Sequence, residues 1–381
     1  MKKFLLGTTA LIGAGMIAGG ALAADSQMAG SSPTVSLGGF ADFEAGWAGQ
    51  KSAYETGVFS RAMKFRDYNQ VHVNVNGQTD NGIGYGAVLQ LEANVTPDDT
   101  NYSTGNADKA YIFIESRLGR LEFGSNTDAA RTLKVDAATF ARASGGIDGD
   151  WYHWVNITGV AGTSMFIVRP DLPTAEQLGT TAPNSNKITY YSPRISGFQG
   201  GISFTPDQGD IGTATGWTGD MNGNYQNVVN GGLNYTAQID KVSVAAAATG
   251  EWARNELSAV TDELSAYNFG ANAGFAGFTV GGSFGEWNHS LQANSGAGND
   301  SYYWDIGGAY ETGPYALSVT FMDSRFASNK FTNVSVGTDY KLAPGLTPFV
   351  EASFFELKEH DAAGTSKNNG SVVLAGTQLN F

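Results

Sequence analysis

Strict alternation of apolar and polar residues, repeated along most of the chain, is the feature that most limits how it can fold. In Val71–Asn76 every odd position is apolar and every even position is polar. The dipeptide Asn81-Gly82 follows, and it readily takes the positive φ angles of a tight hairpin turn. The segment Ile83–Asn94 then continues the alternation in the opposite direction. A period of two predicts strands with one apolar face and one polar face.

Sixteen segments of this kind follow one another, and their connections alternate between short and long. A short connection is Thr79–Gly82; the long ones fall near 48–60, 97–105, 127–185, 207–224, 251–261, 290–300, 323–330 and 358–370. Tight turns at one end and loops at the other predict a closed up-and-down barrel. We expect strands to begin near Val35, Lys64, Ile83, Asp108, Leu121, Lys187, Phe198, Tyr225, Lys241, Glu263, Phe278, Ser301, Tyr315, Phe331, Leu346 and Ser371.

Alternation alone leaves open which face of the strands meets water. A soluble β-sandwich would turn its apolar face inward. Two features favour a membrane barrel instead: strands of roughly nine to twelve residues suit a tilted bilayer crossing, and aromatic residues such as Phe43 and Trp47 collect at strand ends. Sixteen strands enclose an aqueous channel. The expected fold is therefore all-β, a transmembrane antiparallel β-barrel of 16 strands.

The first residues of the chain have a different pattern. Lys2 and Lys3 precede the apolar run Phe4–Ile17, and Ala21–Ala23 offers small residues for cleavage. This predicts a secretory signal peptide over residues 1–23, the alternative being a membrane anchor, and leaves 24–381 as a single barrel domain. The net charge of −14 argues against nucleic acid as a partner, and without cysteine the chain forms no disulfide.

Several segments together carry a family resemblance: Val35–Phe43, Val71–Ala93, Arg117–Gly124, Asn186–Pro206 and the last strand, which ends at Phe381. In order and spacing they resemble the alphaproteobacterial type of Gram-negative outer-membrane general porin. The resemblance implies a water-filled channel in the bacterial outer membrane for passive diffusion of small hydrophilic solutes and ions. It also implies a homotrimer in contact with outer membrane lipid and lipopolysaccharide, and a role for Phe381 as the assembly signal.

In such porins the third long loop folds into the lumen, so the resemblance makes residues 127–185 the constriction loop. Three of its acids would face the channel, the alternative being a solvated outer rim: Asp136, Asp148 and Asp150. The alternation also places charged residues of the wall in the lumen. These residues and two arginines of the loop complete the candidate constriction: Asp42, Glu44, Lys64, Arg66, His72, Glu92, Arg131 and Arg142.

Selectivity and metal binding are predicted from the same comparison. His72 and Ser125 stand where such porins often carry arginine, so the basic wall is thinned and a modest cation preference is expected. The family often binds Ca²⁺ in acidic loops, and no other cofactor is expected. Asp220, Asn222 and Asn224 have the spacing of calcium ligands, but Tyr225 occupies the position that requires glycine.

Two other functional classes are weighed against the channel. An enzyme is disfavoured because none of the four histidines (His72, His153, His289 and His360) lies in a nucleophile or zinc motif, and no catalytic residue is expected. The second alternative is an exported β-rich adhesin or carbohydrate-binding surface protein without a pore. Pore formation in planar bilayers distinguishes the channel from both.

Overall fold

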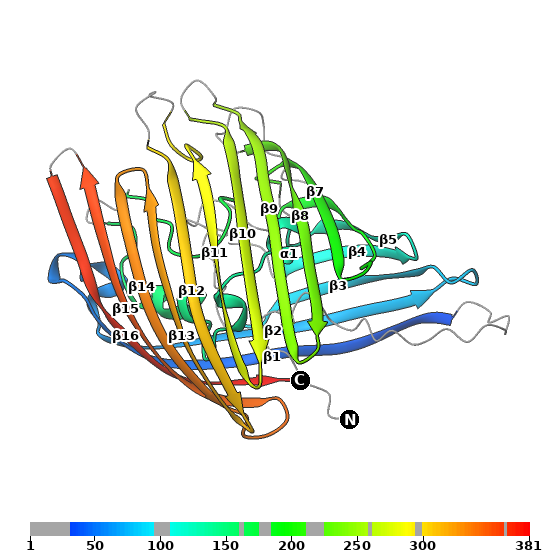
Figure 1. Cartoon of the computed structure of the whole chain (residues 1–381), viewed down its shortest axis with the longest axis horizontal. Helices are drawn as coiled ribbons and strands as arrows, with labels where there is room; N and C mark the ends of the chain where they lie inside the picture. The colour runs from blue at the N-terminus through cyan, green and yellow to red at the C-terminus, as the bar shows by residue number, and fades with distance from the viewer. Residues whose placement is uncertain are drawn as a thin grey trace.

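The computed structural model describes residues 31–94, 107–159, 164–174, 184–210, 225–257, 261–293, 299–361 and 364–381. These residues form sixteen antiparallel strands in one closed barrel, in which each strand pairs with its sequence neighbours and β1 pairs with β16 (Figure 1). The strands are β1 (Ser31–Gly49), β2 (Met63–Gln78), β3 (Gly84–Glu92), β4 (Ala107–Ser116), β5 (Gly119–Ser125), β6 (Asn186–Tyr191), β7 (Phe198–Asp207), β8 (Tyr225–Ile239), β9 (Val242–Asn255), β10 (Leu264–Phe275), β11 (Phe278–Asn288), β12 (Ser301–Thr312), β13 (Tyr315–Phe326), β14 (Asn329–Tyr340), β15 (Leu346–Asp361) and β16 (Gly364–Asn380). The expected signal peptide, 1–23, lies outside the described residues.

The side chains of the wall alternate between lumen and outer surface, as the sequence predicts. In the register of β1 with β2, Glu44 lies opposite Arg66 on the lumen face. On the other face Phe43 and Phe65 are exposed, and their ring centroids lie 5.5 Å apart. An apolar outer face beside a polar inner face is the arrangement that a barrel needs in lipid.

The positions of the strands agree closely with those expected. Every strand start except the first and the last lies within two residues of the predicted one. The long loops expected at 323–330 and 358–370 are wrong, because β13 and β14 are separated only by 327–328 and β15 and β16 only by 362–363. In both hairpins the strands extend through these residues and carry charged side chains on their outer face. Charged residues of this kind are typical of a loop, which explains the wrong prediction.

The ladder that closes the barrel between β1 and β16 runs from Phe40 opposite Asn380 to Gly49 opposite Ser371, and Gly39 and Phe381 extend it at the turn end. The backbone N–H of Gly39 donates to the carbonyl of Phe381 at 3.0 Å, and the N–H of Phe381 donates back to Gly39 at 3.1 Å. A Cβ at Gly39, whose φ is +153°, would lie 2.2 Å from the carbonyl oxygen of Gln70. The last residue is therefore held in the closing ladder by backbone bonds that need glycine beside it.

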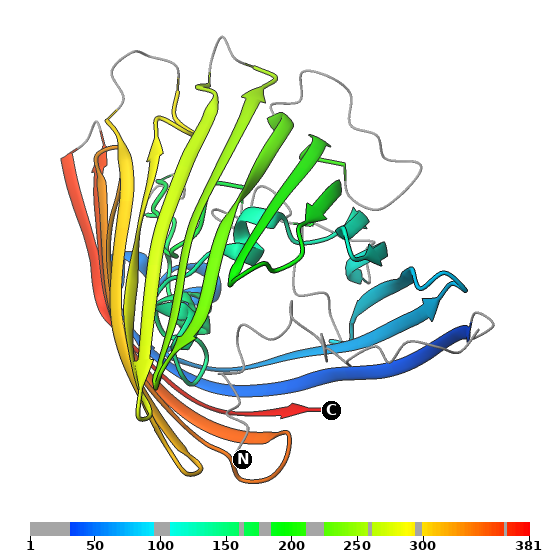
Figure 2. The same cartoon turned by 45° about the vertical axis from the view of Figure 1, so that its right-hand side comes forward.

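The described parts of the segment between β5 and β6, residues 126–159, 164–174 and 184–185, fold into the barrel as the long third loop (Figure 2). It contains α1 (Ala129–Leu133) and the 3-10 turns η3 (Ala138–Phe140), η4 (Gly146–Asp148) and η5 (Asp150–Trp154); η1 (Ser52–Tyr54) and η2 (Gly57–Ser60) lie between β1 and β2. Within the loop α1 contacts β7–β9, η4 contacts β13–β15, and η5 contacts β16 and β1. No helix among the described residues is long and apolar enough to cross a bilayer.

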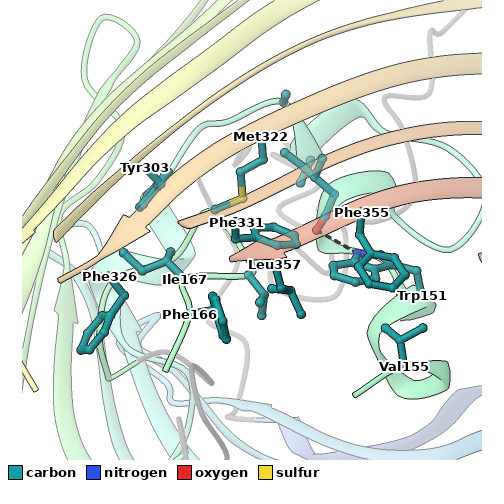
Figure 3. Packing of buried hydrophobic residues seen from close by; sticks show 14 of the residues in the cluster. Trp151, Val155, Phe166, Ile167, Tyr303, Met322, Phe326, Phe331, Phe355 and Leu357 are labelled. Atoms are coloured by element: carbon teal, nitrogen blue, oxygen red, sulfur yellow. Dashed lines mark hydrogen bonds between the residues drawn. The ribbon is translucent and has the colours of Figure 1, made fainter. Parts of the chain in front are cut away.

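Apolar side chains attach the third loop to the inner wall (Figure 3). Trp151 stacks on Phe331 of β14, with ring centroids 5.5 Å apart, and on Phe355 of β15 at 5.8 Å. Its Nε1 donates to the carbonyl of Ile147 at 3.4 Å. Full burial of such a side chain stabilises a fold by about 1.5–3 kcal/mol, so the loop is fixed on the wall.

Glycines on the lumen face of the strands let the loop approach the wall. A Cβ added at Gly46 of β1 would lie 2.0 Å from Nε1 of Trp154, and one at Gly270 of β10 would lie 1.6 Å from the carbonyl oxygen of Val135. No real Cβ tolerates such distances. These two positions must therefore lack a side chain for the loop to occupy its place.

Candidate pore constriction

The third loop first runs around the inner wall in the order of the strands. Backbone N–H groups of the loop donate to wall side chains on its way: Ala129 to Ser203 Oγ of β7 at 2.8 Å, Ala137 to Asp305 Oδ1 of β12 at 2.8 Å, Arg142 to Ser318 Oγ of β13 at 2.8 Å and Gly146 to Glu351 Oε2 of β15 at 3.0 Å. The wall therefore supplies acceptors for the irregular backbone of the loop, as a buried loop requires.

The loop then returns along the same side of the barrel. Asn329 Nδ2 of β14 donates to the carbonyl of Met165 at 2.9 Å, and Trp287 Nε1 of β11 donates to the carbonyl of Asp171 at 3.0 Å. The N–H of Thr174 donates to Glu251 of β9 at 3.2 Å. The helical segments of the loop contact β6–β9, β12–β16 and β1, and the side chain of Arg66 on β2 also bonds to the loop.

One charged cluster joins the loop to the wall. Arg66 Nη1 of β2 donates to Asp150 Oδ1 at 3.0 Å and lies 4.0 Å from Oε2 of Glu44 on β1. His153 Nε2 lies 3.4 Å from the same oxygen of Asp150. Asp42, two positions before Glu44, points to the same face of β1. Two carboxylates thus share one guanidinium where the loop meets the wall, and a third lies on the same face of β1.

A second cluster lies within the loop. Lys134 Nζ lies 2.6 Å from Asp171 and 3.1 Å from Asp136, and Arg131 Nε lies 3.6 Å from Asp171. Burial disfavours the charged form of Lys134, but Asp136 and Asp171 outweigh it and hold the pKa of Lys134 well above its usual range. Arg169 Nε lies 3.6 Å from Asp148. The loop is therefore cross-linked by ion pairs as well as by its apolar contacts.

Comparison with known proteins identifies the family to which this barrel belongs. A family model described as Gram-negative porin matches residues 7–360. The chain belongs to the Gram-negative porin family. The fold and family are those of channels in the outer membrane, where this porin is located.

Individual relatives of this porin are distant in sequence. It is 26% identical over 446 residues to an uncharacterised protein of Rickettsia conorii, with 100% of both chains covered. Among solved structures, the anion-selective porin from Comamonas acidovorans has a TM-score of 0.58 at 14% identity, covering 92% of this chain and 100% of that one. A triple mutant of Rhodopseudomonas blastica porin has a TM-score of 0.57 at 17% identity, covering 91% and 100%. These structures share the fold of this porin.

The predicted acids of the loop differ in exposure. The side chains of Asp148 and Asp150 are 25% and 27% exposed, whereas that of Asp136 is 2% exposed. Asp136 Oδ1 caps the turn at Thr139, accepting from its N–H and its hydroxyl at 2.9 Å each. The structure thus leaves Asp148 and Asp150 partly accessible and turns Asp136 toward Lys134.

The predicted bases are likewise divided between wall and loop. Arg142 is buried and forms an ion pair with Glu311 of β12, whereas the side chain of Arg131 is partly accessible. Lys64 Nζ lies 4.8 Å from the ring centroid of Phe59 near the loop end of β2. Arg131 and Lys64 are therefore placed where they can meet solvent.

The remaining candidates lie on the neighbouring strands β2 and β3. His72 Nε2 lies 3.0 Å from Gln70 Oε1, and Gln70 Nε2 donates to Glu92 of β3 at 3.1 Å. Ser125, the other position where such porins often carry arginine, donates to Asn186 Oδ1 at 2.8 Å. Neither position therefore carries a permanently charged side chain.

Sequence reasoning missed Arg120 of β5 as a residue of the lumen. Its Nε donates to Glu122 at 2.6 Å and its Nη1 to Glu115 at 3.2 Å, both on the inner face. The alternation of β5 carried the signal, because Arg120 has the same parity as Glu122. His153, also missed, could be recognised only from its contact with Asp150.

The possible calcium ligands Asp220, Asn222 and Asn224 lie outside the described residues. Within the residues that the structure does describe, no group of three or more His, Asp or Glu side chains is arranged to hold a metal ion.

Proposed function

We propose that this porin lets small hydrophilic solutes and ions diffuse passively across the outer membrane, with a modest preference for cations. The helical segments of the third loop contact the inner wall at β6–β9, β12–β16 and β1, so the loop narrows the lumen of the barrel. The observation that carries the proposal is the cluster in which Glu44 of the wall and the partly accessible Asp150 of the loop share Arg66, with Asp42 on the same face of β1. Such a cluster attracts cations and repels anions.

The wider charge balance supports a preference that is modest in size. The described part of the loop and the lumen face of β1–β5 each carry five acids against four bases. Charges farther than about 8 Å from a permeating ion are screened at physiological salt, so the groups at the narrowest place decide. In the loop the groups are Asp128, Asp136, Asp148, Asp150 and Asp171 against Arg131, Lys134, Arg142 and Arg169; on the wall they are Asp42, Glu44, Glu92, Glu115 and Glu122 against Lys64, Arg66, Lys109 and Arg120.

The test is the reversal potential of the purified porin in a planar bilayer under a KCl gradient. We expect stepwise conductance and a potential of the sign given by K⁺ permeation. The Comamonas porin, described as anion-selective, serves as the control of opposite sign. Conductance with anion preference at low salt would refute the selectivity, and no conductance at all would refute the pore.

The assembled state is proposed from the family. We infer a homotrimer in contact with lipid and lipopolysaccharide, with apolar outer residues such as Phe65 and Phe354 available for burial. Chemical cross-linking in native outer membranes tests this, with a ladder that ends at three copies as the expected result. A single monomeric band at all cross-linker concentrations would contradict it.

Export and calcium binding are further parts of the proposal. We infer that residues 1–23 are removed as a signal peptide, which the mass of the mature protein tests. We also infer weak Ca²⁺ binding by the acidic loops that contain Asp220, Asn222 and Asn224, which a calcium titration of the purified porin tests. A mature protein that retains residues 1–23, or a titration without heat or spectral change, would refute the respective inference.

A further inference from the structure

Four basic residues form a continuous row across four neighbouring strands at the loop end of the barrel. Arg325 of β13 is the register partner of Lys330 of β14, Lys330 is the partner of Lys358 of β15, and Lys358 is the partner of Lys367 of β16. The strands lie side by side at the left of Figure 1. We call these four residues the basic row.

The basic row faces outward, away from the lumen. The side chains of Lys330, Lys358 and Lys367 are 40%, 41% and 39% exposed, and Arg325 is exposed as well. Lumen residues alternate with them along the same strands, such as Phe331 and Leu357, and these are buried beneath the third loop. The basic row therefore belongs to the outer surface of the barrel.

The position of the basic row relative to the apolar band is fixed by the register. Two residues along each strand toward the turn end lies a polar row of Asp323, Thr332, Glu356 and Asn369. Two residues farther the register partners are Phe321, Val334, Phe354 and Ser371, where the apolar surface begins. At a rise of about 3.4 Å per residue, the basic row lies roughly 13 Å along the strands beyond that surface, the level of lipid headgroups.

Like charges directly opposite each other destabilise a sheet, so the basic row requires negative partners. The barrel supplies two of them. Asp323 lies 2.9 Å from Lys330, while Glu356 lies 2.8 Å from Lys358 and also forms an ion pair with Lys367. Arg325 has no ion pair within the described part of the chain. Four bases against two acids leave a positive patch on a chain whose net charge is −14.

We propose that the basic row binds the phosphate groups of a lipid headgroup in the outer leaflet. Lysine and arginine donate several charge-assisted hydrogen bonds to phosphate, and a row of four matches a headgroup with more than one phosphate. A lipid occupant is favoured over a free anion because the basic row adjoins the apolar band, so the acyl chains of the same molecule would cover Phe321 and Phe354. The inference rests on the proposed function as an outer-membrane channel, in which short turns face the periplasm and the loop end of the barrel faces the outside.

The experiment measures retention of lipid by the full-length mature porin purified from reconstituted vesicles. The vesicles contain bisphosphorylated lipid A or its dephosphorylated form in a neutral phospholipid, and retained lipid A is quantified by mass spectrometry. The variant replaces all four residues of the basic row by glutamine, written R325Q/K330Q/K358Q/K367Q. The matched control is Lys341→Gln, a lysine of similar exposure near the turn end that lies 3.8 Å from Glu311.

We expect the native porin and the control to retain phosphorylated lipid A about tenfold more than the variant. Dephosphorylated lipid A should be retained weakly by all three, and inorganic phosphate in millimolar excess should not compete. Equal retention of the two lipid forms by the native porin would overturn the proposal even if the variant failed to fold. Displacement by inorganic phosphate would overturn it in favour of a soluble anion. Because conductance is measured separately, a porin that conducts but shows no phosphate dependence refutes this inference alone.

Discussion

Arg66 of β2 donates to Asp150 of the third loop at 3.0 Å, and this bond connects the turn η5 of the loop to the barrel wall. The same guanidinium lies 4.0 Å from Glu44. One cation therefore both fastens the loop and neutralises part of an acidic cluster. Removing Arg66 would release this part of the loop from the wall and would also make the acidic cluster more negative. Ion selectivity reports on the second of these effects.

Replacing Arg66 by Met should increase the preference for cations. The variant leaves Glu44 and Asp150 without the cation that they share. A unit charge about 4 Å from an ion contributes on the order of 1 kcal/mol even in bulk water, so the K⁺/Cl⁻ permeability ratio should rise severalfold. The measurement is the reversal potential in a KCl gradient, with Lys341→Met as the control. An unchanged ratio would show that the cluster lies away from the ion path.

Replacing Gly46 by Ala should loosen the loop from β1. The added Cβ would lie 2.0 Å from Nε1 of Trp154, and overpacking of this kind costs about 1–3 kcal/mol of unfolding free energy. We expect a lower unfolding temperature of the folded barrel and a noisier single-channel current. Gly49→Ala is the matched control on the same strand, because nothing lies within 4 Å of a Cβ there. Equal losses in both variants would rule out the contact with Trp154 as the cause.

The wall of the barrel could be predicted from the sequence because strand geometry is local. A period of two decides which side chains share a face of the strand, so the sequence predicts one common face for Asp42, Glu44 and Arg66, in agreement with their register. The same rule would have placed Arg120. What failed at 323–330 was the interpretation of charge: Asp323 and Arg325 are strand residues on the outer surface beyond the apolar band, and they resemble a loop by composition alone.

The loop could not be predicted to the same depth, because its contacts join residues far apart in sequence. The sequence predicts that Asp136 faces the channel. In the structure its side chain is buried, where it contacts Lys134 and caps the turn at Thr139. The partner of Gly270 is the backbone of Val135, and nothing in either segment alone indicates the other. The sequence shows that the wall is rich in glycine, but only the folded structure shows that these glycines make room for the loop.

Acidification should reduce the cation preference, and Asp148 should account for a distinct part of the change. Burial, with a smaller contribution from Asp171, raises the pKa of Asp148 to about 6. Lys134 and Arg169 act in the opposite direction but do not outweigh burial. The carboxylate is therefore charged at neutral pH and gains its proton as the pH falls through that value. In Asp148→Asn the charge is absent throughout, so the change in reversal potential between about pH 7.5 and about pH 5 should be smaller than in the native porin. An identical pH profile in both would exclude Asp148 from the ion path.

The loop end of the barrel should be accessible from outside the cell. In outer-membrane barrels short turns face the periplasm. An epitope tag inserted after Ser328, in the turn between β13 and β14, should bind antibody on intact cells, and a tag between Asp80 and Asn81 should bind only after the membrane is permeabilised. The reverse labelling would invert the orientation and remove the basis for placing the basic row in the outer leaflet.

Deleting Phe381 should impair assembly more than it impairs the finished fold. The side chain of Phe381 is exposed, and the backbone bonds with Gly39 are the only ones that hold the residue in the part of the barrel described here. Loss of two backbone hydrogen bonds costs about 1–3 kcal/mol, which a barrel of this size tolerates. A large fall in the amount recovered in the outer membrane, with normal refolding of the same variant in detergent, would therefore reflect recognition of the terminal aromatic residue during assembly. Phe354→Ala, which also removes an exposed outer phenyl ring, is the control and should assemble normally. Undiminished assembly without Phe381 would eliminate its role as a signal.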